Sequence, residues 1–375
     1  MRQLPRYFFD LCVGSLSLLL LGYITIRLWR AASRSWRPLV AAAAFLIALI
    51  VIAGVALSPL RIQNRFPNDT VVITRAVAIF TVAWIFTGFL IALIWERIPR
   101  TNPTRRRLLQ TATLATPAVL TAAAFINRDR LRFDDQRLTI AGLPQDLDGL
   151  RIALVSDLHL SPIVPESLVA RAIDMANEAR PHITVVAGDL ISRFGDPLDR
   201  SIYQISRLKA EAGVYGCLGN HEMYVICEDY VQHEAGKRGV MFLRHQKQVL
   251  TFGGARLNLA GVDFQSSRKP YLIGGEKLVE PGMLNILLSH NPDVFPVAAK
   301  LGFDLTLAGH THGGQVNFEI LHHNLNIARF FTPYTMGEYR IGDAAAYVTR
   351  GVGTIGLPVR LNAPPEVTLI QLCAT

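Results

Sequence analysis

The sequence of 375 residues is poor in cysteine, and the spacing of its cysteines is uninformative. Only four are present and no two form a Cys-x-x-Cys pair, which excludes the common thiolate zinc and redox motifs. The sequence also lacks a Gly-x-Ser-x-Gly motif and a phosphate-binding P-loop. These absences argue against a serine nucleophile on an α/β-hydrolase fold and against a P-loop nucleotide hydrolase.

Lysine is absent from residues 1–125, where 14 arginines accompany only three acidic residues. The whole chain has a net charge of +9, so its positive surplus belongs to this first third. The remaining two thirds are close to neutral and show no cluster of excess lysine and arginine. We therefore expect no nucleic-acid partner.

Half of the sequence is hydrophobic, and its longest apolar runs lie in the first third. About 20 apolar residues cross a bilayer as a helix. We predict an all-α transmembrane region of about four helices within residues 1–126, at Leu11–Ile26, Leu39–Leu57, Ala76–Ile94 and Leu108–Phe125. Arginines crowd residues 27–37 and 97–107, and positive-inside reasoning keeps these two loops in the cytoplasm. The chain after the fourth span then lies outside, whereas it faces the cytoplasm if the fourth segment does not cross.

The pattern changes after a linker and entry strand at residues 127–149, and we predict an α/β domain over residues 150–375. Three apolar runs alternate with two helical stretches, which predicts a β-α-β-α-β unit with parallel strands. A Gly253-Gly254 turn between two further runs indicates a hairpin. The predicted strands are Arg151–Val155, Ile183–Ala187, Val214–Leu218, Gln248–Phe252, Ala255–Val262, Leu284–Leu288 and Leu305–Ala308, and the predicted helices are Pro165–Ala179 and Leu198–Ala210.

Five of the predicted strands end in polar residues of the kinds that bind metals. In open α/β sheets, ligands bind at the carboxyl ends of strands, so we expect these residues to meet. They are Asp157 and His159, Asp189, Asn220 and His221, His290, and His310 and His312. On an extended backbone, residues i and i+2 point the same way, so the last two imidazoles should face one point.

This donor set predicts two divalent metal ions. Two carboxylates, an amide and several imidazoles without cysteine suit Mn, Fe or Zn better than Ca or Mg. Asp189 stands in the middle of the series, and a carboxylate has two oxygens that can bridge two ions. We therefore expect Asp189 to lie between the metals.

The same residues form five motifs in a fixed order: Asp157-Leu-His159, Gly188-Asp189, Gly219-Asn220-His221-Glu222, His290 and Gly309-His310-Thr-His312. In this order they resemble the signature of the calcineurin-like metallophosphoesterase superfamily. The closing run Thr349–Pro358 is similar to a bacterial membrane-associated branch. The resemblance covers residues 150–372 and implies an αββα sandwich.

The resemblance also implies a role for each motif residue. One ion would be held by Asp157, His159, Asp189 and His312, and the other by Asp189, Asn220, His290 and His310. His221 would face the substrate and act in catalysis, either by stabilising the phosphoryl group or by protonating the leaving oxygen. Glu222 would be a second catalytic residue that orients His221.

The sequence thus predicts a membrane-bound phosphoesterase that hydrolyses a phosphoester or pyrophosphate bond by a metal-activated hydroxide. We expect a phosphorylated, lipid-linked substrate, a multi-pass location in a bacterial inner (cytoplasmic) membrane and an extracytoplasmic catalytic domain. One alternative is a UDP-2,3-diacylglucosamine pyrophosphatase that faces the cytoplasm. Another is a membrane sensor or scaffold with an inactive domain. A transporter is disfavoured, because the predicted spans contain too few charges for an ion path.

Overall fold

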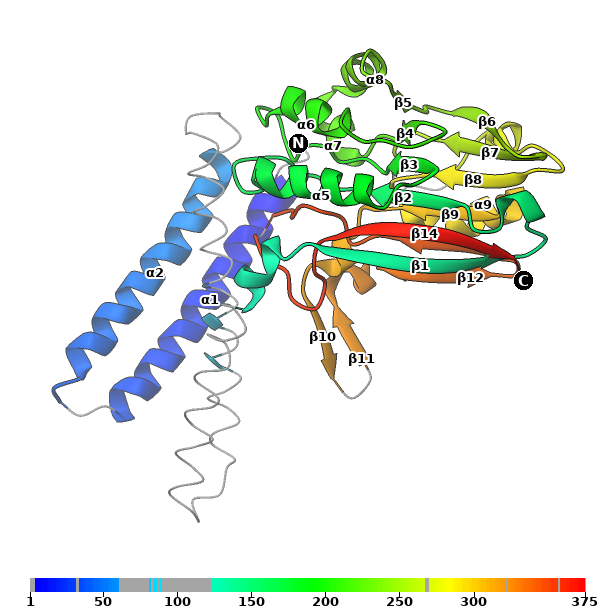
Figure 1. Ribbon diagram of the computed structural model, residues 1–375. Helices are drawn as coiled ribbons and strands as arrows, with labels where there is room; N and C mark the ends of the chain where they lie inside the picture. Colours follow the sequence, from blue (N-terminus) through cyan, green and yellow to red (C-terminus); the bar gives the residue numbers. More distant parts are fainter. Residues whose placement is uncertain are drawn as a thin grey trace. The chain divides into compact units, whose positions relative to one another are not determined.

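The computed structural model describes residues 4–31, 34–60, 81, 84–85, 88–89, 123–266, 270–320, 323–356 and 358–374. The chain divides into two compact units, residues 1–123 and residues 124–375 (Figure 1).

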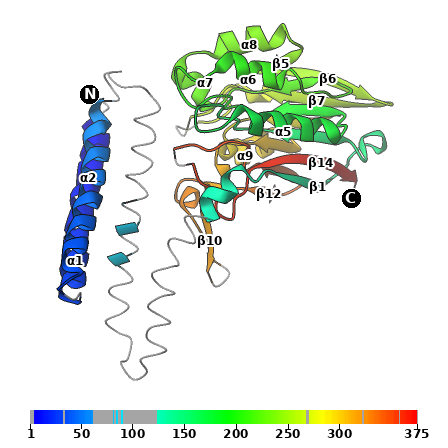
Figure 2. The same ribbon diagram turned by 60° about the vertical axis from the view of Figure 1, so that its left-hand side comes forward.

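The N-terminal unit contains two long helices, α1 (Leu4–Ala31) and α2 (Arg37–Leu60), which lie side by side (Figures 1 and 2). Leu21 of α1 and Val51 of α2 are buried against each other and against Ile85. The first two predicted spans fall within α1 and α2, and nearly all of the other two lies outside the described residues. In the part of the chain that the structure describes, no helix has both the length and the apolar character of a bilayer span, so the predicted transmembrane region is unsupported there.

The C-terminal unit contains two six-stranded sheets and a separate hairpin. The first sheet has the order β1-β14-β2-β3-β4-β5, in which β2 to β5 are parallel and β14 runs antiparallel to β2. Its strands are β1 (Arg132–Ile140), β14 (Glu366–Ala374), β2 (Arg151–Val155), β3 (Ile183–Val186), β4 (Val214–Gly216) and β5 (Val240–Phe242). The predicted parallel β-α-β-α-β unit is confirmed, with α5 (Glu166–Glu178) between β2 and β3 and α6 (Leu198–Ile205) between β3 and β4.

The second sheet has the order β12-β13-β9-β8-β7-β6, with β7, β8, β9 and β13 parallel and both edge strands antiparallel to their neighbours. The predicted hairpin is confirmed as β6 and β7. The strands are β12 (Gly337–Ile341), β13 (Ala344–Val348), β9 (Leu305–Ala308), β8 (Leu284–Leu288), β7 (Ala255–Gly261) and β6 (Gln246–Phe252), and the separate hairpin is β10 (Asn317–Ile320) with β11 (His323–Asn326).

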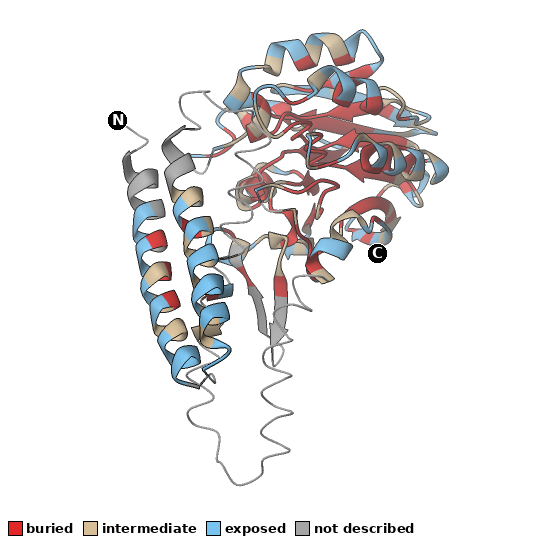
Figure 3. Cartoon of the chain, turned by 90° about the vertical axis from the view of Figure 1, so that its left-hand side faces the viewer, coloured by how far each residue is buried: buried red, intermediate tan, exposed pale blue. Residues whose placement is uncertain are grey.

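The two sheets pack face to face, and helices cover their outer faces (Figures 1 and 2). Apolar side chains of both sheets, such as Leu154 of β2 and Ile286 of β8, form one buried core between them, which is the red interior of Figure 3. The helices are α5 (Glu166–Glu178), α6 (Leu198–Ile205), α7 (Asn220–Val225), α8 (Glu228–Gly236) and α9 (Phe295–Leu301), and the short 3-10 helices are η2 (Asn127–Asp129), η3 (Gln145–Leu147), η4 (Gly275–Leu278), η5 (Pro292–Val294), η6 (His312–Gly314) and η7 (Ile327–Phe330). The predicted αββα sandwich is confirmed for residues 124–375.

The helices cover the sheets because their apolar residues recur on one face. In α5, Leu168, Ala172 and Ala176 are buried at a spacing of four residues, which is the stripe of an amphipathic helix. This stripe packs with residues of α6, α8 and the first sheet in one cluster. On the second sheet, Ala298 of α9 packs with Leu287 of β8 and Phe303. This packing leaves the strand ends free to carry polar side chains.

Candidate metal centre

The carboxyl ends of the parallel strands bring the predicted ligands together. Asp157 and His159 follow β2, Asp189 follows β3, and His290 follows β8. The Asp157 N–H donates to the Gly188 carbonyl at 2.9 Å, which joins the ends of β2 and β3 directly. As expected for parallel strands, residues far apart in the sequence therefore meet at one edge of the sandwich.

The backbone at this edge is strained. Five predicted ligands have a left-handed backbone, with φ between 46° and 74°: Asp157, His159, Asp189, His310 and His312. A residue with a side chain pays about 1–2 kcal/mol for this conformation, and such strain concentrates at functional sites. The expectation of an extended backbone at His310 and His312 is wrong. The tight turn instead aims the two imidazoles into different clusters.

The first cluster consists of Asp157, His159 and His312. The Nε2 atoms of the two imidazoles are 3.1 Å apart, and His312 Nε2 lies 3.3 Å from Asp157 Oδ1. The side chains of Asp157 and His159 are fully buried, and that of His312 is nearly so. These donors could hold one metal ion.

The second cluster consists of Asp189, His290 and His310. His290 Nε2 lies 3.0 Å from Asp189 Oδ2 and 3.2 Å from His310 Nδ1. The ring of Phe264 lies against both imidazoles, with centroid distances of 5.9 Å to His290 and 5.4 Å to His310. The second cluster thus has an apolar wall beside its donors.

One carboxylate oxygen of Asp189 lies between the two clusters. Its Oδ2 lies 3.0 Å from His290 Nε2 and 3.5 Å from His159 Nε2. Its Oδ1 accepts a hydrogen bond of 2.9 Å from the backbone N–H of His221. The sequence predicted that Asp189 lies between two metals, and in the structure its Oδ2 faces both clusters while its Oδ1 fixes the carboxylate.

Asn220 supplies an observation that fits a metal. Its Oδ1 is buried and has no hydrogen-bond partner among the described residues. A buried amide oxygen without a partner carries a desolvation cost of about 1–3 kcal/mol, which a bound cation would remove. A mixed set of imidazole, carboxylate and amide donors also suits Mn, Fe or Zn. The residues present therefore fit a divalent metal centre.

The Nδ1 atoms of His290 and His159 each have a polar partner, so Nε2 of each ring is the nitrogen that faces the metal site. His290 Nδ1 lies 2.6 Å from the Ala187 carbonyl oxygen, which can only accept, so this nitrogen carries the proton. His159 Nδ1 lies 3.1 Å from the Ser192 hydroxyl. Such partners fix the ring orientation of metal-ligating histidines.

Burial and charge shift the pKa values of the cluster residues in opposite directions. Burial raises the pKa of Asp157 to about 6 and lowers the pKa of His159 to about 3. Burial likewise lowers the pKa of His310 to about 4. Burial would also lower the pKa of His290, but the Asp189 charge opposes it and raises that pKa to about 10. Burial would raise the pKa of Asp189, but the charge of His290 lowers it, so the metal-free centre at neutral pH holds a charged His290 beside an ionised Asp189.

His221 lies at the edge of the centre, with its ring partly exposed. Its Nδ1 donates to the Ser192 carbonyl oxygen at 2.5 Å, which leaves Nε2 facing Asp189 Oδ2 at 4.0 Å. His159, Asp189 and His221 also lie close enough to form a third group that could hold a metal. The geometry is therefore compatible with a substrate-facing His221 and with a ligating one.

Glu222 is fully buried, and its carboxylate is hydrogen-bonded to the backbone. Its carboxylate accepts hydrogen bonds from the N–H groups of Asp189, Leu190 and Gly219 at 2.7–3.0 Å. These bonds join the end of β3 to the start of α7. We expected Glu222 to orient the His221 ring. Instead, the His221 ring is hydrogen-bonded to the Ser192 carbonyl oxygen. We assign Glu222 a positioning role for the two loops.

Sequence reasoning missed Ser192 and Arg360. Ser192 contacts His159 through its hydroxyl and His221 through its carbonyl, although no motif includes it. Arg360 is fully buried and donates to the His312 carbonyl oxygen at 2.8 Å. No pattern identified Arg360, because it stands alone between apolar residues in a stretch rich in proline.

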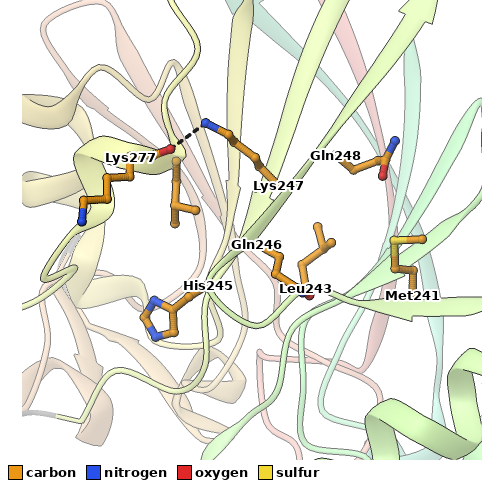
Figure 4. Close-up of a pocket in the computed structure, with 8 residues that line it drawn as sticks. Met241, Leu243, His245, Gln246, Lys247, Gln248 and Lys277 are labelled. Atoms are coloured by element: carbon orange, nitrogen blue, oxygen red, sulfur yellow. Dashed lines mark hydrogen bonds between the residues drawn. The ribbon is translucent and has the colours of Figure 1, made fainter.

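A surface cavity of about 440 Å³ lies apart from these residues (Figure 4). Its lining includes Leu243, His245 and Leu278, and none of its lining residues belongs to the clusters. Lys247 crosses it and donates to the Lys277 carbonyl oxygen at 2.6 Å. Because this lysine also pairs with Glu280 at 2.7 Å, the cavity offers no unpaired lysine charge at this position. We do not connect it with the metal centre.

Comparison with known proteins adds independent support. A family model described as calcineurin-like phosphoesterase matches residues 150–314. The chain is 30% identical over 282 residues to "Phosphodiesterase YaeI" of Escherichia coli (strain K12), covering 72% of this chain and 98% of that protein. It is also 31% identical over 280 residues to "Transmembrane protein with metallophosphoesterase domain" of Danio rerio, covering 71% of this chain and 61% of that protein.

A protein of the same name from Bos taurus is 30% identical over 249 residues, which cover 62% of this chain and 55% of that protein. The chain thus spans only part of these two longer relatives, whereas it covers nearly all of the E. coli protein. The strand-end motifs and these matches agree, and the chain belongs to the calcineurin-like phosphoesterase family of metal-dependent phosphoric ester hydrolases.

Proposed function

We propose that the protein hydrolyses a phosphodiester bond at a centre for two divalent metal ions. The observation that carries the proposal is the pair of adjacent donor clusters, with Asp189 Oδ2 within 3.5 Å of a histidine from each. The E. coli relative is named a phosphodiesterase, which favours a diester over a monoester.

The two ions would divide the donors between them. One would be held by Asp157, His159, Asp189 and His312, and the other by Asp189, Asn220, His290 and His310. When bound, two such ions neutralise the phosphate charge and make a water molecule acidic enough to attack at neutral pH. A protein nucleophile is then unnecessary, in keeping with the absence of a nucleophile motif from the sequence.

His221 would act on the leaving group. Its Nδ1 proton is committed to the Ser192 carbonyl, so Nε2 is the nitrogen that can carry and deliver a second proton. Nε2 faces the centre, and its ring packs edge-on against Tyr224 at a centroid distance of 5.5 Å. A fixed imidazole of this kind is suited to protonate the departing oxygen.

We extend the proposal to membrane attachment and a lipid-linked substrate. The support comes from the sequence, where Leu39–Leu57 contains no charged residue, and from two relatives named transmembrane proteins. The arginine distribution favours an extracytoplasmic C-terminal domain. A reporter fused after Thr375 should show active alkaline phosphatase and dark green fluorescent protein. The opposite pattern would contradict this orientation.

The enzymatic proposal is tested with purified protein in Mn²⁺ against bis-p-nitrophenyl phosphate and p-nitrophenyl phosphate. We expect hydrolysis that a chelator abolishes, with the diester preferred. Asp189→Asn is the inactive control, and His233→Ala is a matched active control on an exposed surface. Full metal content without hydrolysis of either compound would overturn the proposal.

A further inference from the structure

Several large apolar side chains of the C-terminal unit are exposed near its metal centre. Among its described residues, seven large apolar side chains are more than 60% exposed. Five of these lie on segments that carry residues of the centre or are hydrogen-bonded to such a segment, with exposures between 65% and 87%, and the other two are Ile126 and Ile273. We call these five the apolar rim: Phe194, Tyr224, Ile226, Phe330 and Phe331.

Three rim residues flank the His221 side of the centre. Phe194 is two residues from Ser192, which contacts both His159 and His221. The Tyr224 ring packs against the His221 ring. Ile226 caps α7, the short helix that begins with Asn220, and its left-handed backbone turns the chain there. These apolar tips are thus fixed to the residues of the centre.

The other two rim residues flank the His312 side. Phe330 ends η7 and Phe331 follows it. Asn326 caps η7 by accepting from the Ala328 N–H at 2.8 Å, and it also donates to the Gly313 carbonyl at 2.7 Å, next to His312. In Figures 1 and 2, α7 and the β10–β11 hairpin that precedes η7 lie at the same end of the two sheets.

The chemistry of the rim fits a lipid bilayer better than a packed protein partner. Its side chains belong to three separate segments of the chain, at residues 194, 224–226 and 330–331, and exposed aromatic and branched side chains suit the interfacial zone of a membrane. An arginine directly precedes the phenylalanines on both sides, Arg193 and Arg329. Arg329 is exposed, whereas Arg193 also contacts Asp196. Such basic residues near a membrane surface attract anionic headgroups.

We propose that the apolar rim docks the C-terminal unit onto the surface of a bilayer that contains anionic lipids. Apolar side chains of this kind enter a membrane by about 5–10 Å, to the boundary between headgroups and acyl chains. A phosphodiester at headgroup depth then reaches the two donor clusters without leaving the bilayer. The inference rests on the proposed function and deepens it by naming the surface through which the C-terminal unit would reach a phosphodiester held in the bilayer.

The main test uses the full chain, labelled with 5-fluorotryptophan and reconstituted into nanodiscs that contain phosphatidylglycerol. All four native tryptophans lie in residues 1–125, so one introduced into the C-terminal unit adds one new ¹⁹F resonance. Phe331→Trp puts this probe on the rim. Ile341→Trp is the matched control, because Ile341 is exposed but pairs with Ala344, at the start of β13 and away from the strand ends of the centre.

A spin-labelled lipid should broaden the resonance of Phe331→Trp and leave that of Ile341→Trp unchanged. Equal behaviour of the two probes would overturn the proposal. Protection of the rim probe from water without broadening by the lipid would also overturn it, since another protein surface would then cover the rim. This readout needs no catalysis, so it stays informative even if the chain does not cleave phosphodiesters.

A kinetic measurement adds a second arm. Phe330→Ser combined with Phe331→Ser should lower hydrolysis of a vesicle-presented phosphodiester at least tenfold, because burial of one phenylalanine contributes more than the free energy of a tenfold change. Ile341→Ser should not lower it. A double variant as fast as the unsubstituted protein on vesicles would contradict the docking, whereas failure of the unsubstituted protein on soluble bis-p-nitrophenyl phosphate would contradict the proposed function instead.

Discussion

Arg360 donates to the backbone of His312 and lies beside its ring. The guanidinium Nη1 donates to the His312 carbonyl oxygen at 2.8 Å, and Nη2 lies 3.2 Å from Nδ1 of the imidazole. The same group donates to the carbonyls of Gly353 and Ala363, so one side chain ties the loop after β9 to the segment before β14. Burial lowers the pKa of Arg360 to about 10, so it stays charged at neutral pH.

Arg360→Lys should weaken metal binding in the first cluster selectively. Lysine keeps the charge but loses the planar fork that serves several acceptors at once. Loss of an outer-shell partner of this kind lowers metal affinity about 10- to 100-fold. Mn²⁺ titration followed by electron paramagnetic resonance should show one weakened and one unchanged site. Arg207→Lys, at the partly exposed ion pair with Asp174, is the matched control. Two unchanged sites together with a lower urea midpoint would show that Arg360 acts on folding alone.

Asp189→Asn should remove both metal ions, whereas Asp157→Asn should remove one. Asp189 Oδ2 faces a histidine of each cluster, while the nearest imidazole nitrogen to Asp157 Oδ1 is that of His312 at 3.3 Å. The asparagine keeps the size of the side chain but not its charge. Elemental analysis of purified variants should give about zero and about one ion per chain. Full metal content in Asp189→Asn would contradict the shared oxygen.

His221→Ala should retain both metal ions and lose about 10²–10⁴-fold in turnover, the range of a general acid or base. The reason is that the seven other predicted donors suffice for two ions, while Nε2 of His221 is free to serve the leaving group. Metal content and kcat should be measured on the same preparation, with the exposed His233→Ala as control. Loss of one ion would assign His221 to the third donor group instead.

The sequence predicted best where an apolar run ends in a polar motif. Leu305–Ala308 is both the predicted and the observed strand β9, because a short buried run bounded by glycine leaves little choice of structure. The turn at His310 and His312 was not foreseen, since its left-handed backbone is set by tertiary contacts rather than by residue type. Asp157, for example, accepts the His310 N–H with both carboxylate oxygens.

Long-range pairing also escaped the sequence. β1 and β14 pair over nine residues although more than 200 residues separate Arg132 from Glu366. The sequence likewise does not indicate that Arg360 supports the metal centre. Its acceptors are backbone carbonyls, which every residue type provides. Local patterns can identify which residues are buried or bind metal, but they do not show which distant segment completes the contact.

Metal affinity should rise with pH across the neutral range. The pKa of His290 is raised to about 10 by the charges of Asp189 and Asp157, in spite of its burial, so its Nε2 holds a proton at pH 7 in the metal-free protein. Ligation at Nε2 must release this proton, and affinity should therefore increase up to about tenfold per pH unit below pH 10. Below about pH 6 the slope should steepen, because Asp157 is then protonated as well.

Calorimetry at pH 7 in buffers of different ionisation enthalpy measures this proton release. About one proton should leave with the ion of the second cluster, and none from His159 or His310, because burial lowers both of their pKa values below 5. Zinc binding to a chelator of known proton release calibrates the experiment. A binding enthalpy that does not depend on the buffer would contradict a charged His290.

Gly219→Ala should disrupt the centre by steric contact alone. The backbone of Gly219 has an ordinary φ of −95°, so alanine brings no torsional strain there. Its Cβ, however, would lie 2.1 Å from Asp189 Oδ1 and 2.6 Å from the Asp189 backbone nitrogen. Real atoms do not approach so closely, and the Asp189 carboxylate would have to leave the position in which its Oδ2 faces both clusters. We expect loss of both metal ions and of hydrolysis, measured by elemental analysis and the diester assay.

Gly236→Ala is the matched control, since it stands in α8 and its Cβ position has no atom within 4 Å other than its chain neighbours and the backbone of its own helix. Alanine favours a helix over glycine by up to about 1 kcal/mol, so this variant should keep its metal and unfold at the same or a slightly higher urea concentration. Normal metal content in Gly219→Ala would mean that β3 and α7 can separate to admit a methyl group. The three backbone hydrogen bonds that the Glu222 carboxylate accepts join these elements and argue against such a separation.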